Sequence, residues 1–359
     1  MKITYIAETS LSNRSAYTHH VLKMCDSLCK KGDVTLIIPF ASVNLNFNKI
    51  KKDFLLKTKK DILIKSILST KIKNFLFRLI FGFKSAFYLK NNRSDLVISR
   101  SLISSFFLCV FKINHFLEIH TELKGITKFL LINLNYINSK YILKTILISK
   151  SLSNRFPKIN KKKHLVLHDA VDINDFKLKK RTKLIKSITY VGSFYKGKGI
   201  ELILRLAKKF KQIKFNIYGD SLGNIYKKSK NVKIHGYIGY NEVPKVLANS
   251  DILILPSADI QFGRTKNINI TNYNSPLKMF DYLAAGKVIL ASKRDGICEI
   301  LKDNYNSIIV NQYDLRSWSE ALKKILSNKY DLNKLRKNSV LTAKKNTWDK
   351  RILKILDEI

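Results

Sequence analysis

A stretch from Val191 to Gly199 places two lysines among glycines, between an apolar run and a helical pattern. Glycines such as Gly192 let a backbone approach a ligand closely, and the start of a helix favours an anion. The side chains of Lys196 and Lys198 supply the positive charge that a diphosphate requires. Loops of this kind are common, so the stretch indicates a phosphate site only together with other motifs.

A second stretch, residues 274–287, is the strongest motif in the chain. Ser275 precedes Pro276 where a helix is expected to begin, and Gly286 follows where it ends. The backbone N–H groups at 276–279, Pro276 excepted, can bind a phosphate. Asp281 lies one turn further along, where a carboxylate can accept the hydroxyls of a ribose. Good capping alone would not explain why this helix accompanies glycine loops.

Two more expected strands end in glycine, at Gly219 and Gly236. The following residues, such as Tyr237, would flank a nucleobase through backbone groups. An ordinary turn between strand and helix explains them equally well.

An alternation of short apolar runs with helical patterns positions these motifs. The expected strands are 2–7, 34–39, 95–99, 116–119, 145–148, 164–167, 187–191, 214–218, 232–235, 252–256 and 288–292. The pattern predicts an α/β protein with two successive doubly wound units and ligands at the carboxyl ends of the strands. We expect an N-terminal domain over 1–173, a linker over 174–186, a C-terminal domain over 187–340, and a terminal segment, 341–359, that packs back on the first domain.

The composition is strongly basic, with 67 Lys and Arg against 26 Asp and Glu and a net charge of +41. Compositional drift toward lysine is one interpretation, and attraction to a polyanion is the other. Residues 49–93, which include Lys71 and Lys73, have Asp53 and Asp61 as their acidic residues and interleave lysines with apolar residues, as basic amphipathic helices do. This segment predicts contact with an anionic membrane surface. No apolar run reaches the roughly 20 residues of a membrane span, so we expect a cytoplasmic protein, peripheral at the membrane.

The four cysteines, at 25, 29, 109 and 298, do not complete a metal site with histidines, and no carboxylate cluster has divalent-metal spacing. We therefore expect no metal and no cofactor. Paired His19 and His20 at a helix start are expected to pack or cap rather than to catalyse.

In order and spacing, the motifs resemble those of the retaining glycosyltransferases of the GT-B fold, family four or group 1. The resemblance covers nearly the whole chain. Its further motifs are Asp95 to Ser101, Glu118-Ile119-His120, His168 to Phe176, Val232 to Ser257, Gly296 with Glu299, and Trp348.

The resemblance implies two Rossmann-like domains facing across a cleft and a UDP- or GDP-sugar as donor. Lys198 matches the lysine that contacts the donor diphosphate, and Leu277 and Lys278 match the backbone positions that receive the distal phosphate. Asp281 matches the residue that binds ribose, and His120 the histidine near the reacting end of the sugar. The acceptor would be a glycan or a lipid-linked molecule, as in polysaccharide or lipopolysaccharide biosynthesis, and transfer would retain the anomeric configuration.

Three positions depart from the family pattern. Tyr273, eight residues before Asp281, replaces the acid that grips the sugar, and Ser193 stands where many relatives have an arginine. The loop 12–16 lacks the usual glycines. Stabilisation of the leaving group then depends on Lys198, assisted by Arg14 or Lys196.

Two other functions remain open on the sequence. A nucleotide-sugar epimerase of the GT-B fold would share these motifs. A nucleic-acid-binding protein would explain the charge, but it lacks an RNA-recognition signature, and we expect no nucleic-acid partner.

Overall fold

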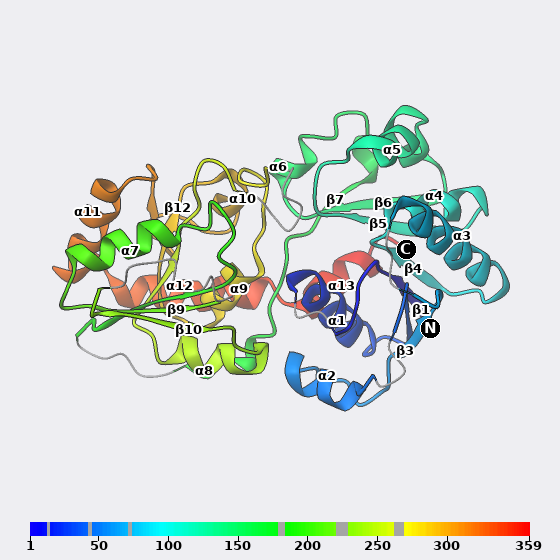
Figure 1. Cartoon of the computed structure of the whole chain (residues 1–359). Helices are drawn as coiled ribbons and strands as arrows, with labels where there is room; N and C mark the ends of the chain where they lie inside the picture. The colour runs from blue at the N-terminus through cyan, green and yellow to red at the C-terminus, as the bar shows by residue number, and fades with distance from the viewer. Residues whose placement is uncertain (13–14, 42–44, 71–73, 179–183, 220–228, 262–268) are drawn as a thin grey trace. The chain divides into compact units, whose positions relative to one another are not determined.

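Two structural units make up the chain (Figure 1). Unit 1 comprises residues 1–168 and 348–359, and unit 2 comprises residues 169–347. The structure is a computed structural model that describes residues 1–12, 15–41, 45–70, 74–178, 184–219, 229–261 and 269–359. Arg14, Lys71, Lys73 and part of the expected linker, 179–183, lie outside the described residues.

Unit 1 is built on a 7-stranded sheet with the order β3-β2-β1-β4-β5-β6-β7, in which all pairs are parallel. The strands are β1 (Lys2–Ile6), β2 (Asp33–Ile38), β3 (Leu63–Ser66), β4 (Leu96–Ser99), β5 (His115–Ile119), β6 (Ile142–Leu147) and β7 (His164–Val166). The helices are α1 (Ala16–Leu28), α2 (Phe47–Phe54), α3 (Phe75–Asn91), α4 (Leu102–Val110), α5 (Gly125–Lys128), α6 (Lys150–Ser153) and α13 (Trp348–Leu356), with a π-helix η1 (Phe129–Asn133) and a 3-10 turn η2 (Tyr136–Asn138).

Unit 2 repeats the plan with a 6-stranded parallel sheet in the order β10-β9-β8-β11-β12-β13. Its strands are β8 (Ser187–Val191), β9 (Lys214–Tyr218), β10 (Val232–Gly236), β11 (Ile252–Leu255), β12 (Val288–Ser292) and β13 (Ile308–Val310). Its helices are α7 (Ile200–Lys209), α8 (Val243–Ala248), α9 (Leu277–Ala284), α10 (Asp295–Cys298), α11 (Leu315–Leu326) and α12 (Leu332–Lys345).

Alternate residues of the central strands build the two cores of unit 2. Ile252 and Ile254 of β11 join the cluster that contains α7 and α11, whereas Leu253 and Leu255 join the cluster that contains α9. Because helices cover both faces, the strand is apolar at every position, as is typical of parallel sheets. The prediction of two doubly wound α/β units is confirmed.

The expectation of basic amphipathic helices over residues 49–93 was wrong at β3. Leu63–Ser66 pairs with β2 as the edge strand of the sheet, and its four side chains are exposed or half-buried. An edge strand of this kind shows neither a continuous apolar run nor a clear alternation, so its sequence resembles the neighbouring basic segments.

Helix α13 packs on α1 within unit 1, although the two are far apart in the sequence. The ring of Trp348 meets that of His20 edge to face, with 5.1 Å between centroids. At the next residue, the carboxylate of Asp349 accepts from Ser27 Oγ at 2.6 Å and pairs with Lys30 Nζ at 2.6 Å. No helix in the described residues has the length and apolar character of a membrane span.

A buried carboxylate, Glu118 on β5, holds α13 to the sheet. Arg351 Nη2 lies 2.5 Å from Glu118 Oε1, and both side chains are buried. Arg351 also donates to the carbonyls of Leu167 and His168, and Tyr5 donates to the second carboxylate oxygen. Burial alone would raise the pKa of Glu118, but neighbouring His20 and Arg351 hold it well below its usual range.

We predict that Arg351→Met destabilises unit 1 by about 3 kcal/mol or more, since it leaves Glu118 as an uncompensated buried charge. Urea denaturation followed by Trp348 fluorescence in a Trp318→Phe background measures the change. Lys354→Met, at an exposed position of the same helix, is the control and is expected to alter stability by less than about 0.5 kcal/mol. Equal midpoints for the two variants would contradict the structural role of the ion pair.

Candidate functional site

The strand order of each unit reverses direction at one place, and ligands of such sheets bind there, beyond the carboxyl ends of the strands. In unit 2 the reversal lies between β8 and β11, and in unit 1 between β1 and β4. The loops that follow these strands hold most of the residues singled out from the sequence.

The loop after β8 begins at Gly192, where the lack of a side chain leaves space. This residue has a φ of +152°, and a Cβ there would lie 2.5 Å from Nζ of Lys278. Tyr190 Oη donates to the carbonyl of Ser193 at 2.7 Å, which fixes the start of the loop. Gly192 therefore gives space to a lysine from a helix far along the chain.

The first turn of α9 presents backbone N–H groups that no side chain caps. Pro276 occupies the N-cap position with an extended backbone, and Ser275 before it is buried. Leu277 and Lys278 open the helix, where N–H groups have no intrahelical partner. Gly286, with a φ of +61°, follows the C-cap at Ala285, as the sequence predicts.

Two lysines lie near this turn, and no acidic group of the described residues acts on their pKa values. Lys278 Nζ lies 3.9 Å from the centroid of the Tyr190 ring. Burial lowers the pKa of Lys198 to about 8, and burial together with the charge of Lys198 holds the pKa of Lys278 well below its usual value. An anion at this position would relieve both effects. Lys196 on the same loop is exposed.

Asp281 is buried and accepts a hydrogen bond from Tyr240 Oη at 3.1 Å. Burial, and next the charge of Asp281, raise the pKa of Tyr240 well above its usual value, so this phenol remains a donor. One residue further, Tyr282 Oη accepts from the backbone N of Val191 at 2.9 Å. Helix α9 is thereby fixed to the end of β8.

The ends of β8, β9 and β10 lie side by side through their glycines. The N–H of Gly192 bonds the carbonyl of Tyr218 at 2.9 Å, and the N–H of Gly219 bonds the carbonyl of Gly236 at 2.8 Å. A Cβ on Gly219 would lie 2.0 Å from the carbonyl oxygen of Gly192, so only glycine fits. Tyr237 follows with 45% of its side chain exposed.

Tyr273, which replaces the expected acid, is buried, and the backbone beside it passes close to α10. A Cβ on Gly296 would lie 2.7 Å from the carbonyl oxygen of Asn274, and the N–H of Gly296 bonds the carbonyl of Asn272 at 2.8 Å. Gly296 thus permits the approach of the segment that leads into α9.

In unit 1, His120 follows β5 and has both ring nitrogens engaged. Nδ1 lies 3.0 Å from Arg100 Nη2, and Nε2 lies 3.0 Å from Glu118 Oε1. Because a guanidinium only donates, Nδ1 must accept and Nε2 must hold the proton. Burial and the charge of Arg100 lower the pKa of His120 to about 3, so the ring is neutral.

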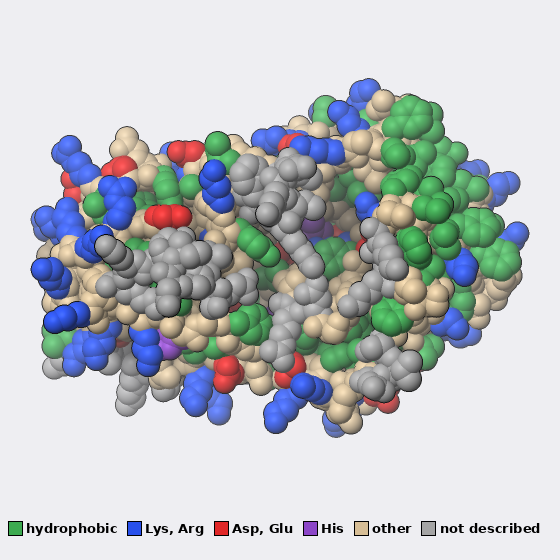
Figure 2. All heavy atoms as spheres, in the orientation of Figure 1, with side chains coloured by type: hydrophobic (Ala, Val, Ile, Leu, Met, Phe, Trp, Pro, Cys, Tyr) green, Lys and Arg blue, Asp and Glu red, His purple; other side chains and the backbone are tan. Residues whose placement is uncertain are grey.

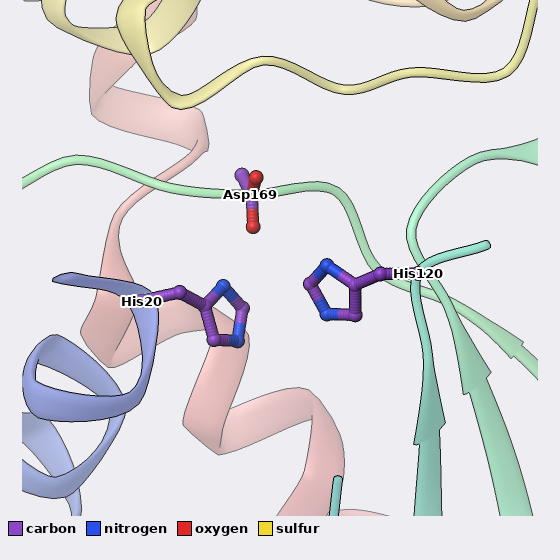
Figure 3. A group of neighbouring side chains, drawn as sticks. All are labelled: His20, His120 and Asp169. Atoms are coloured by element: carbon purple, nitrogen blue, oxygen red, sulfur yellow. The ribbon is translucent and has the colours of Figure 1, made fainter. Parts of the chain in front are cut away.

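His20 of α1 lies beside this ring, as Figure 3 shows, with 4.8 Å between the two ring centroids. Its Nε2 is 2.9 Å from the same Glu118 oxygen. Asp169, also labelled in the figure, begins unit 2. His19 instead packs edge to face on Phe54 of α2, at 5.9 Å between centroids, in agreement with the expected packing role.

Sequence reasoning missed the residues that surround the strand reversal of unit 1. Glu8 follows β1 and accepts from Arg78 at 2.7 Å and from Ser101 at 2.8 Å. Arg100 follows β4 and lies 4.0 Å over the ring of Tyr17. Their positions just after adjacent strands are the signal that could have identified them. In unit 2, Arg294 after β12 was missed likewise and donates to the Ser257 carbonyl at 2.7 Å.

Comparison with known proteins agrees with this arrangement. Residues 172–344 match the family described as Glycosyl transferases group 1. An uncharacterized glycosyltransferase of Methanocaldococcus jannaschii is 22% identical over 238 residues, which span 60% of this chain and 60% of the relative. The match thus covers less than two thirds of that relative's length.

Two solved structures share the fold over nearly their whole length. A glycosyltransferase from Rickettsia africae has a TM-score of 0.75 at 17% identity, covering 99% of this chain and 97% of its own. Anabaena HepE in complex with UDP-glucose has a TM-score of 0.72 at 14% identity, covering 100% of both chains. The chain has the GT-B fold, and its residues 172–344 are similar to the Glycosyl transferases group 1 family.

Proposed function

We propose that the chain is a glycosyltransferase that moves a sugar from a nucleoside diphosphate to a glycan or lipid-linked acceptor. One observation supports this more than any other. Lys198 and Lys278 meet at the uncapped first turn of α9, where burial disfavours the charge of both. A diphosphate would supply the missing negative charge and use the free N–H groups.

Each donor-binding residue has a part in this proposal. The N–H groups of Leu277 and Lys278 receive the distal phosphate, and Gly192, Ser193 and Lys196 line the approach of the diphosphate. Gly219 and Tyr237 flank the nucleobase. Asp281 accepts a ribose hydroxyl with the carboxylate capacity that its bond to Tyr240 leaves.

The reaction proceeds through charge stabilisation on the departing group. The bond between the anomeric carbon and the phosphate oxygen breaks, and its electron pair stays on the nucleoside diphosphate. The acceptor hydroxyl forms the new bond and gives its proton to a phosphate oxygen of the donor. Fixed lysines and helix dipoles cost no reorganisation while this charge develops. We propose retention at the anomeric carbon, in line with family four.

Because both ring nitrogens of His120 are engaged, we propose that the ring orients the reacting sugar and excludes water from it, rather than exchanging a proton. A proton-transfer role would require one of these hydrogen bonds to open. We further propose that the chain works at the surface of an anionic membrane, where lipid-linked acceptors are found.

A thermal-shift screen against UDP-, GDP- and ADP-sugars tests donor binding, and anomeric NMR of the product tests retention. We expect one nucleotide class to stabilise unit 2, with the free diphosphate nearly as effective as the sugar donor, because the lysines bind the phosphates. Stabilisation by none of them would contradict the proposal.

Lys198→Ala is expected to lower turnover about a hundredfold or more, the usual effect of removing one stabilising donor from a charged transition state. Transfer and donor-hydrolysis assays measure it. Lys208→Ala, an exposed lysine on the following helix, is the matched control and should leave turnover unchanged. Near-normal activity of Lys198→Ala would remove this residue from the site.

Donor affinity should also fall as pH rises. The pKa of Lys198 in the free protein is lowered to about 8, so the side chain is charged below that pH and neutral above it. The anionic donor binds the charged form, and affinity is therefore full near pH 7 and declines above pH 8. Calorimetric titrations with UDP in buffers of different ionisation enthalpy would show proton uptake near pH 8. Lys198→Met should reduce that uptake to the part that Lys278 contributes, and a wild type without uptake would contradict the assignment.

A further inference from the structure

An uncovered aromatic surface extends over α3, α4 and the segment that contains η1 and η2 in unit 1. Its rings contact one another in sequence: Phe87 with Phe83 at 6.2 Å, Phe83 with Phe107 at 5.7 Å, and Phe106 with both Phe107 at 5.3 Å and Tyr136 at 4.7 Å. Phe111 completes it at 5.6 Å from Phe83. We call these six residues the aromatic face.

Other large apolar side chains surround the aromatic face and are open to solvent. Exposed fractions run from 36% to 60% for the aliphatic and aromatic residues of this surface, which are Leu76, Ile80, Phe83, Phe87, Val110, Ile126, Phe129 and Leu134. Figure 2 shows apolar side chains gathered with lysines among them over this part of unit 1. Contiguous apolar surface of this extent marks an interaction site rather than scattered exposure.

The packing of α3 explains why these rings point outward. Gly82 lies against α4, where a Cβ would come within 2.8 Å of the Ile103 side chain. Phe81, Ser85 and Leu89 are buried on the same side. Because the close approach fixes this face of α3 inward, Phe83 and Phe87 are left on the outer side.

The charge of this surface has one sign. The sequence has no acidic residue over 62–94, 96–117 and 123–168, and exposed lysines accompany the rings at positions 84, 90, 112, 124 and 128. Lys90 Nζ lies 5.6 Å from the centroid of the Phe111 ring, so a positive charge borders the aromatic face directly. Of the acids that separate these ranges, Asp95 accepts from the backbone N of Lys2, Glu118 is buried and Glu122 pairs with Arg155. Glu8 pairs with Arg78 of α3.

A surface with exposed aromatic and aliphatic side chains among lysines fits the boundary between lipid headgroups and acyl chains. A second copy of the chain would oppose one set of lysines to another. Nucleic acid would use the charge and the rings but would leave the aliphatic residues Leu76, Ile80 and Val110 in contact with phosphates and water. The chemistry therefore favours an anionic bilayer over either macromolecule.

We propose that the aromatic face inserts into the interface of an anionic bilayer, with the neighbouring lysines on the headgroups. This deepens the membrane partnership proposed above and places it on a partly different set of residues. None of the apolar side chains named for this surface comes from residues 49–66 of the expected segment. The lysines there include Lys51 and Lys60, which pair with Asp61 and Asp33. Residues 102–136, outside the expected segment, supply eight of the twelve apolar side chains named for this surface.

The test is sedimentation of the full chain with vesicles of phosphatidylcholine alone or mixed with phosphatidylglycerol. We expect binding to the mixed vesicles only, weakened by salt. Phe83→Ser/Phe87→Ser should reduce the partition coefficient about tenfold or more. Lys84→Gln/Lys90→Gln/Lys112→Gln should reduce it by about fivefold for each lysine that contacts the headgroups.

Matched controls remove the same number of exposed groups elsewhere. Leu341→Ser/Leu353→Ser and Lys208→Gln/Lys211→Gln/Lys337→Gln should bind vesicles like the wild type. Circular dichroism confirms that each variant is folded. If the controls and the aromatic-face variants lose binding equally, charge or apolar content in general is responsible and the proposal is overturned.

A reporter residue tests insertion itself. Trp318 and Trp348 are buried, so Phe83→Trp adds an exposed fluorophore. We expect its emission to shift to the blue on mixed vesicles and to be quenched by brominated acyl chains. Unchanged emission on bound vesicles, or salt-sensitive binding to RNA without binding to vesicles, would overturn the proposal.

The outcome is independent of the proposed reaction. UDP-sugar binding by Phe83→Ser/Phe87→Ser should equal that of the wild type, because these residues are far from the donor site in the sequence and belong to unit 1. Lost vesicle binding with intact donor binding would support the docking surface. If the protein binds vesicles but no nucleotide, the proposed reaction is contradicted and the docking surface is not.

Discussion

Every strand in both sheets runs parallel to its neighbours, so every connection must cross a face of the sheet and return to the starting edge. In the orders 3-2-1-4 and 10-9-8-11, successive connections depart in opposite directions from the central pair. The carboxyl ends of these strands are consequently not covered by a crossover. Glu8, Arg100 and His120 assemble there in unit 1, and Gly192, Lys198 and the start of α9 assemble there in unit 2. The topology alone brings together residues as far apart in sequence as Lys198 and Lys278.

Buried charge is handled in opposite ways in the two units. Glu118 has the guanidinium of Arg351, the ring of His120 and the phenol of Tyr5 around it, so its charge is satisfied within the fold. A carboxylate whose partners all lie within the fold stabilises the folded structure. The lysine pair of unit 2 is different, because each ammonium is desolvated and the two repel. Such an arrangement costs stability unless a ligand completes it, and that asymmetry supports the proposal that the lysines, rather than Glu118, meet a substrate.

The sequence predicted five of the six strands of unit 2 but missed β13, and it predicted the contacts of unit 1 poorly. Strands such as Lys214–Tyr218 and Val288–Ser292 were predicted at their observed bounds because buried parallel strands are apolar runs with polar ends. β3 was missed because an exposed edge strand lacks that pattern. The Ser-Pro-Leu-Lys helix start could be predicted because the residues that supply its N–H groups are consecutive in the sequence. The pairing of His20 with Glu118 could not, because it joins a helix and a strand almost a hundred residues apart in the chain, and no local pattern encodes that distance.

The position of the basic residues supports the second interpretation of the net charge, attraction to a polyanion. Drift in composition would place lysines without regard to acids or to exposed rings. Near the first sheet edge the lysines do have acidic partners, as in Lys51 with Asp61 and Lys60 with Asp33. Over α3, α4 and the η1–η2 segment the local sequence holds no acidic residue, and exposed large apolar side chains gather there as well. Exposing rings to water costs free energy, and gathering like charges adds a second, electrostatic cost. A single partner, negatively charged at its surface and apolar beneath, would offset both costs at once, and a bilayer has that structure.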